Sequence, residues 1–159
     1  VSLWIKSPTE AIGFGSIHGK GKKARKILGI ANGSIWLRGK DVDSIYKVEE
    51  TKGSYQTKSV FKKPGVNLVD NSIMEKDKIY YVSHDESKLI MFDINTGEDR
   101  EIYTTPNKNI KILAAIGDNI LISEWKEDNE HVNYYDAVGD KTAKNYYINN
   151  SGKVLYELD

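Results

Sequence analysis

The chain has 159 residues, and its 23 Lys and Arg residues balance its 23 Asp and Glu residues. Net charge therefore gives no long-range attraction toward nucleic acid or an anionic membrane. With 39% hydrophobic residues and no cysteine, the composition is that of a globular domain, and it excludes disulfides, thiol nucleophiles and cysteine-type zinc sites. The longest apolar runs reach only about five residues, too short for a membrane-spanning helix.

The first strong pattern is an apolar run, a polar turn and a second apolar run over residues 26–37. The same order returns at 71–82 and at 111–122. Ile35, Ile79 and Ile120 hold the corresponding positions, at spacings of 79 − 35 = 44 and 120 − 79 = 41 residues. A period of a few tens of residues is typical of repeat architectures.

Each unit continues with two more runs joined by a glycine-containing turn. The runs are 45–49 and 56–61 in the first unit, 88–93 and 100–104 in the second, and 132–136 and 144–148 in the third. Their Ile, Val and Tyr content predicts four antiparallel strands per unit. The second strand is apolar at consecutive positions, which indicates burial on both faces. The fourth is polar, as expected of an outer edge.

Four strands per repeat and a period of about 40 resemble a β-propeller. The segment 77–83, followed by 89–98, is similar to blades of bacterial extracytoplasmic propellers of the YWTD-related type. The resemblance implies an all-β single domain over 1–159, with blades at about 26–65, 66–110 and 111–150. It is too broad to carry over any functional residue.

A closed ring needs at least four blades. We expect a composite closing blade from residues 151–159 and 1–19, with 153–158 as its second strand. The alternatives are a fragment of a larger propeller, an open arc that closes by forming a homo-oligomer, and a β-sandwich. The absence of cysteine fits the cytoplasm as well as export, but because the chain begins at Val1 rather than Met, we expect a secreted or extracytoplasmic protein.

The loops between second and third strands hold the candidate ligand-binding residues, since equivalent loops of successive blades emerge on one face. These residues are Asp41, Asp43, His84, Asp85, Glu86, Trp125 and His131. Together they suit a polar ligand such as a sugar against the indole face, a cation, or acid/base work by a carboxylate pair. The alternative interpretation is that these loops are polar only for solubility.

The strongest charge run is a candidate polyanion-binding patch formed by Lys20, Lys22, Lys23, Arg25 and Lys26. A solvated loop explains the same run. Aromatic residues are not interleaved with it, so nucleic acid is not an expected partner.

No motif predicts a cofactor, a metal or a catalytic residue. Residues 13–21 lack the spacing of a phosphate-binding loop, and 93–98 fit a hairpin turn better than a calcium loop. We therefore expect a non-enzymatic module that binds a partner protein or a glycan. The alternatives are an enzyme that acts on glycans or phosphoesters through the acidic loops, and a self-assembling structural protein.

Overall fold

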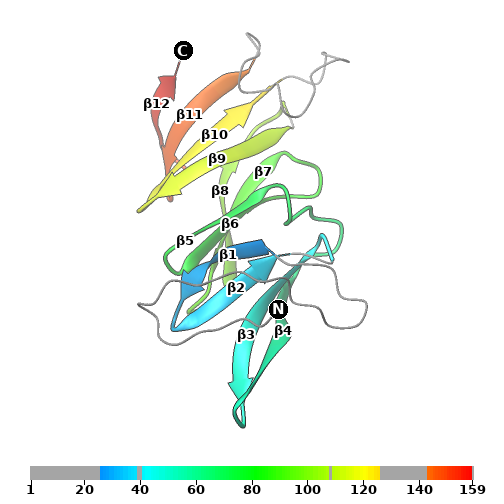
Figure 1. The fold of residues 1–159 in the computed structure, drawn as a ribbon. Helices are drawn as coiled ribbons and strands as arrows, with labels where there is room; N and C mark the ends of the chain where they lie inside the picture. The colour runs from blue at the N-terminus through cyan, green and yellow to red at the C-terminus, as the bar shows by residue number, and fades with distance from the viewer. Residues whose placement is uncertain (1–25, 39–40, 108, 126–142, 159) are drawn as a thin grey trace. The chain divides into compact units, whose positions relative to one another are not determined.

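The computed structural model describes residues 26–38, 41–107, 109–125 and 143–158. These residues form twelve β-strands in three four-stranded antiparallel sheets, and none of them is helical (Figure 1). The all-β class predicted from the sequence is confirmed. The chain forms two compact units, residues 1–63 and 64–159.

Unit 1 contains one sheet in the order β1-β2-β3-β4. Its strands are β1 (Lys26–Ala31), β2 (Ser34–Arg38), β3 (Ser44–Thr51) and β4 (Ser54–Lys62). The β1–β2 and β3–β4 turns each place two consecutive residues at positive φ: Asn32 with Gly33, and Lys52 with Gly53. That conformation defines the two-residue turn whose twist matches a hairpin.

Unit 2 contains two sheets of the same kind. The first holds β5 (Ser72–Glu75), β6 (Lys78–Val82), β7 (Lys88–Asp93) and β8 (Glu98–Thr104). The second holds β9 (Ile110–Ile116), β10 (Asn119–Glu124), β11 (Lys144–Asn149) and β12 (Val154–Leu158). Within each sheet every strand pairs with its neighbour in the chain. The two sheets meet where β9 lies against β5 and β6.

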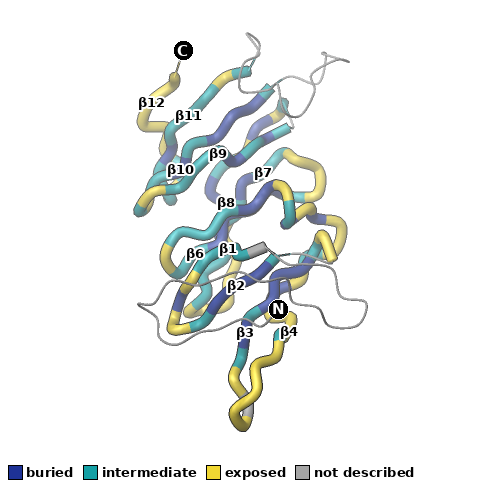
Figure 2. The backbone as a smooth tube through the Cα atoms, in the orientation of Figure 1, coloured by how far each residue is buried: buried dark blue, intermediate teal, exposed yellow. Residues whose placement is uncertain are grey.

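The core of unit 2 lies between these two sheets, and Figure 2 shows the buried stretches along β6 and β10. One sheet contributes Tyr80, Val82, Leu89, Met91 and Ile102, and the other contributes Ile110, Ile112, Ile120, Ile122 and Ile148. Burying each large aliphatic side chain is worth about 1.5–3 kcal/mol. Burial of this apolar layer is therefore the main contribution to the free energy that holds the two sheets face to face.

The isoleucines that define the sequence pattern occupy matching places. Ile35, Ile79 and Ile120 are each the second residue of the second strand in their sheet, and each is buried. Their partners on the first strand lie five residues earlier in every case. The expected burial of the second strand on both faces is confirmed, and β4 and β8 are mostly exposed, as expected of outer strands.

The prediction for the end of the chain was wrong. β11 pairs directly with β10, so 144–149 is the third strand of its sheet rather than the fourth. β12 pairs with β11, so 154–158 is the fourth strand of this sheet and not part of a separate closing blade. The run 132–136 and residues 1–19 lie outside the described residues.

A tight turn between β11 and β12 explains why these two strands pair with each other. The Asn149 side-chain oxygen accepts the backbone N–H groups of Ser151 and Lys153, at 3.1 and 2.9 Å. Gly152 takes a φ of +85°, which glycine adopts without a steric cost. The turn closes a hairpin between two adjacent runs, so β12 pairs with its neighbour in the chain.

Candidate functional site

Three segments of unit 2 lie together at one end of its two sheets, which we call the loop end. They are the β6–β7 loop (83–87), the described residues of the β8–β9 connection (105–107 and 109) and the end of β10. Thr105 N–H donates to the Ser87 carbonyl at 2.9 Å, and Ile110 N–H donates to the Glu86 carbonyl at 3.1 Å. Ile110 is also the strand partner of Glu124. The β10–β11 loop therefore starts at the same end as the loop 83–87.

The loop 83–87 is held by its own side chains. Asp85 accepts the Ser83 hydroxyl at 2.6 Å and the Ser87 hydroxyl at 2.8 Å. The hydroxyl of Ser83, followed by that of Ser87, lowers the pKa of Asp85 to about 2. His84 donates from Nδ1 to the Gly65 carbonyl at 2.5 Å. Asp85 and His84 thus set the shape of the loop, and Glu86 is exposed.

We expect the Asp85 carboxyl to titrate near pH 2 rather than near its ordinary value of 3.8. A lowered pKa in the fold means that the hydrogen bonds to Asp85 add stability above pH 4 and are lost as the pH falls toward 2. Replacing Ser83 and Ser87 with alanine should return the midpoint toward 3.8. An NMR titration of the Asp85 carboxyl carbon measures both midpoints, and an unchanged midpoint in the double variant would contradict this assignment.

Glu124 is a buried carboxylate between the two sheets, with only 5% of its surface exposed. It accepts the Tyr103 hydroxyl at 3.0 Å and the Asn107 amide at 3.2 Å. Burial, followed by the hydrogen bond to Glu124, raises the pKa of Tyr103 well above its ordinary value. The Tyr103 ring lies 6.3 Å from the Tyr146 ring, centroid to centroid. Glu124 therefore ties the two sheets together beside the loop end.

The sequence analysis assigned no role to Glu124, which directly precedes the polar loop after β10. Ile120, Ile122 and Glu124 alternate along β10, so all three point to the face that packs on the other sheet. The signal available in the sequence was that Glu124 continues the period-two pattern of the isoleucines, which indicates that it lies on the same buried face.

Trp125 follows Glu124 directly and is partly buried. It is the candidate ligand-binding aromatic residue that the structure places at the loop end. His131 lies outside the described residues, as do Lys20, Lys22, Lys23 and Arg25 of the basic run. Lys26 starts β1, and its side chain is also outside the described part.

Asp41 and Asp43 belong to unit 1, where they support the β2–β3 connection. Asp41 accepts the Tyr46 hydroxyl through its side chain. Asp43 accepts the Ser44 hydroxyl at 3.0 Å and lies 3.9 Å from the Lys62 ammonium. Because these aspartates belong to the other unit, their grouping with the loop 83–87 stays a prediction.

In the part of the chain that the structure describes, no three His, Asp or Glu residues are grouped so that they could hold a metal ion. The segment 93–98 forms a hairpin turn, in which Asp93 accepts the Asn95 N–H through its side chain and the Gly97 N–H through its carbonyl, both at 2.8 Å. Over the described ranges, no helix has the length and apolar character needed to cross a bilayer.

No protein-family model matches this chain, and no curated protein matches it either.

Proposed function

We propose that the chain is a propeller-like, non-enzymatic binding module whose loop end binds a glycan. The propeller-like reading is supported by three sheets of identical strand order and by the face-to-face packing of two of them in unit 2. In this proposal the sheets act as blades, and the loops between second and third strands form the variable surface.

The observation that carries the proposal is the presence of Trp125 at the same end as the loop 83–87. An indole offers a large apolar face for a sugar ring, and neighbouring polar groups supply hydrogen bonds to its hydroxyls. His84 and Glu86 are both exposed there. The hydrogen bonds of Asp85 hold this loop in one conformation before any ligand arrives, which lowers the entropic cost of binding.

The same geometry disfavours a glycan-cleaving enzyme that uses Asp85. A general acid needs a carboxyl whose pKa is raised toward neutrality, whereas the hydrogen bonds from Ser83 and Ser87 lower the pKa of Asp85. Binding of carbohydrate polymers also fits the extracytoplasmic location that we propose for the protein.

The test is a glycan array followed by calorimetry on the retained glycans. Replacing Trp125 with alanine should weaken binding about 10- to 30-fold, as is usual for loss of a central aromatic contact. Tyr55→Ala is the matched control, because Tyr55 is an exposed aromatic residue on β4 of unit 1. Equal affinities of Trp125→Ala and the unaltered chain, or an array that retains no glycan, would contradict the proposal. Capture of a partner protein alone would favour the alternative ligand.

A further inference from the structure

The outer face of the second sheet in unit 2 points away from the β5–β8 sheet. Ile120 and Ile122 of β10 and Ile148 of β11 belong to the core between the two sheets. Side chains alternate along a strand and strand partners share a face, so the residues beside these isoleucines lie on the outer face together with their strand partners. They include Lys111, Leu121, Ser123, Asn145, Tyr147 and Tyr156.

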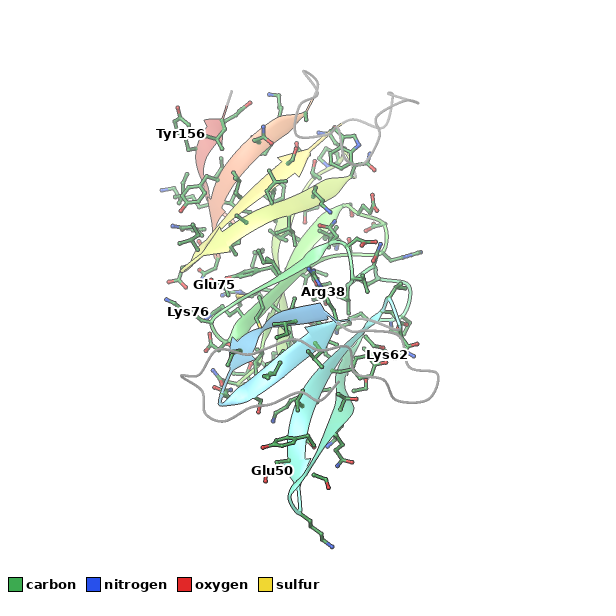
Figure 3. The ribbon with its side chains drawn as sticks, viewed as in Figure 1. Arg38, Glu50, Lys62, Glu75, Lys76 and Tyr156 are labelled. Carbon is green, nitrogen blue, oxygen red and sulfur yellow. The ribbon has the colours of Figure 1, made fainter. Side chains whose placement is uncertain are left out.

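A pair of tyrosines lies on this face. Tyr147 and Tyr156 are strand partners, and Tyr156, seen on β12 in Figure 3, keeps 63% of its surface exposed. In each sheet the corresponding pair lies beside the third residue of the second strand. The pairs of the other two sheets are Met91 with Arg100 and Lys47 with Lys58. The aromatic pair is therefore particular to this sheet, and it offers a large apolar surface with few rotatable bonds.

Two polar atoms without partners lie next to the tyrosines. Ser123 and Asn145 are strand partners, and among the described residues neither the Ser123 Oγ nor the Asn145 Oδ1 has a hydrogen-bond partner. The same register position in the β5–β8 sheet holds Val82 and Leu89, which pack against the neighbouring sheet. An aliphatic pair suits the stacking of sheets, whereas unpartnered polar atoms make such stacking costly. The outer face therefore suits a ligand that brings hydroxyl groups.

The charges on this face have one sign. Lys111 lies in the row of the two polar residues and donates to the Asp70 carbonyl at 2.7 Å, and the alternation of β12 brings the exposed Lys153 to the same side. The only acids of the four strands, Glu124 and Glu157, lie on the core side. Two copies of this face would bring like charges together, whereas an anionic ligand complements it.

We propose that this outer face binds an acidic polysaccharide, whose chain runs along β10 from Trp125 to the tyrosine pair. The proposal rests on the glycan binding proposed for the loop end, and it names the class of glycan. The alternation of β10, continued by one residue, places Trp125 on the side of Ser123. Leu121, in the row of the tyrosines, precedes Trp125 by four residues, or about 13 Å along a strand. A disaccharide does not cover that path, so the ligand is a polymer.

Each group on the face has a role in this arrangement. Sugar rings stack on the Trp125 indole and on the Tyr156 ring. Sugar hydroxyls donate to the Asn145 Oδ1 and exchange a hydrogen bond with the Ser123 Oγ, which gives both buried atoms a partner. Carboxylates of the polymer lie near Lys153, which attracts them from the rim of the face.

Affinity electrophoresis in gels that contain polygalacturonate, alginate or hyaluronate tests the proposal, with dextran as the uncharged polymer. We expect at least one acidic polymer to retard the chain more than dextran does, and we expect added salt to reduce the retardation. Tyr156→Ser should weaken binding to that polymer about fivefold or more, whereas Tyr156→Phe keeps the ring and should retain it. Lys153→Glu should weaken binding by a similar factor, because it replaces an attraction with a repulsion.

Tyr55→Ser and Lys58→Glu make the same changes on the exposed strand β4 of unit 1 and should leave binding unaltered. Far-ultraviolet circular dichroism of each variant shows that the sheets are retained. Retardation by none of the acidic polymers, or equal retardation by dextran, overturns the proposal. So does unaltered binding of Tyr156→Ser and Lys153→Glu, or a doubled mass in sedimentation without polymer, which would assign the face to a second copy.

The two proposals can fail separately. An uncharged glycan that binds through Trp125 while every acidic polymer fails to bind would leave the function of the loop end standing and refute the outer face alone. Binding of an acidic polymer that depends on Tyr156 but not on Trp125 would refute the path along β10. Absence of binding to any glycan would refute both proposals.

Discussion

Replacing Gly152 with alanine is expected to destabilise unit 2 by roughly 3–5 kcal/mol, a large part of a typical domain stability. An added Cβ would overlap the Ile102 carbonyl oxygen and lie 3.0 Å from the carbonyl carbon. Both atoms are backbone atoms of β8, so neither moves without disturbing the sheet. The positive φ of 85° adds the usual cost of a left-handed conformation for a residue with a side chain.

Gly97→Ala is the matched control for this substitution. Gly97 also lies in a hairpin turn of unit 2 at a φ of +75°, and no atom comes within 4 Å of an added Cβ. Its replacement should cost only about 1 kcal/mol, the conformational part alone. Urea unfolding of both variants measures the difference. Equal losses would show that the approach of the β11–β12 turn to β8 does not contribute to stability.

The close approach has further support in the structure. The Arg100 guanidinium of β8 donates to the Asn150 carbonyl in the β11–β12 turn at 2.8 Å. The outer strands of the two sheets are thus joined at this turn as well as through the isoleucine core. Glycine at position 152 is what allows the two backbones to come so close.

Glu124→Ala is expected to cost about 2–4 kcal/mol. The substitution leaves the Tyr103 hydroxyl and the Asn107 amide without their acceptor between the two sheets. A buried donor that loses its partner costs about 1–3 kcal/mol, and a small cavity adds to this loss. Glu124→Gln, which keeps one side-chain acceptor oxygen, should cost less than Glu124→Ala. Urea unfolding again provides the measurement.

The neighbouring Ser123 provides the control. Its side chain is fully buried, and its hydroxyl has no hydrogen-bond partner among the described residues. Ser123→Ala removes a buried polar group without breaking a hydrogen bond, so it should be neutral or stabilising. If Ser123→Ala and Glu124→Ala were equally destabilising, packing rather than the hydrogen bonds of Glu124 would account for the loss.

The agreement between sequence and structure is closest in the inner strands. Ile35, Ile79 and Ile120 identify these strands in the sequence. A strand that is buried on both faces must be apolar at successive positions, so its pattern is easy to recognise. The glycine turns at Gly53 and Gly97 were also readable, since their positive φ selects glycine. The local sequence pattern was therefore enough to predict the inner strands and these two hairpin turns.

The local sequence pattern did not predict which strands pair at the end of the chain. Lys144–Asn149 and Val154–Leu158 both have the composition of a strand, but composition does not say which strand lies beside which. The Asn149 turn decided that pairing through side-chain to backbone hydrogen bonds. The loop end shows the same limit, because Asp85 looks like a free acid in the sequence until its two serine partners are seen.

By itself the sequence determined that this chain is an all-β protein with strongly buried second strands and glycine-containing hairpins, because burial and positive φ each restrict residue type at single positions. Only the tertiary structure decided that Glu124 joins two sheets, that Gly152 lies against β8, and that β12 is an outer edge. These features depend on atoms that are distant in the chain but close in space. The residue type at one position does not show which distant residue it will contact.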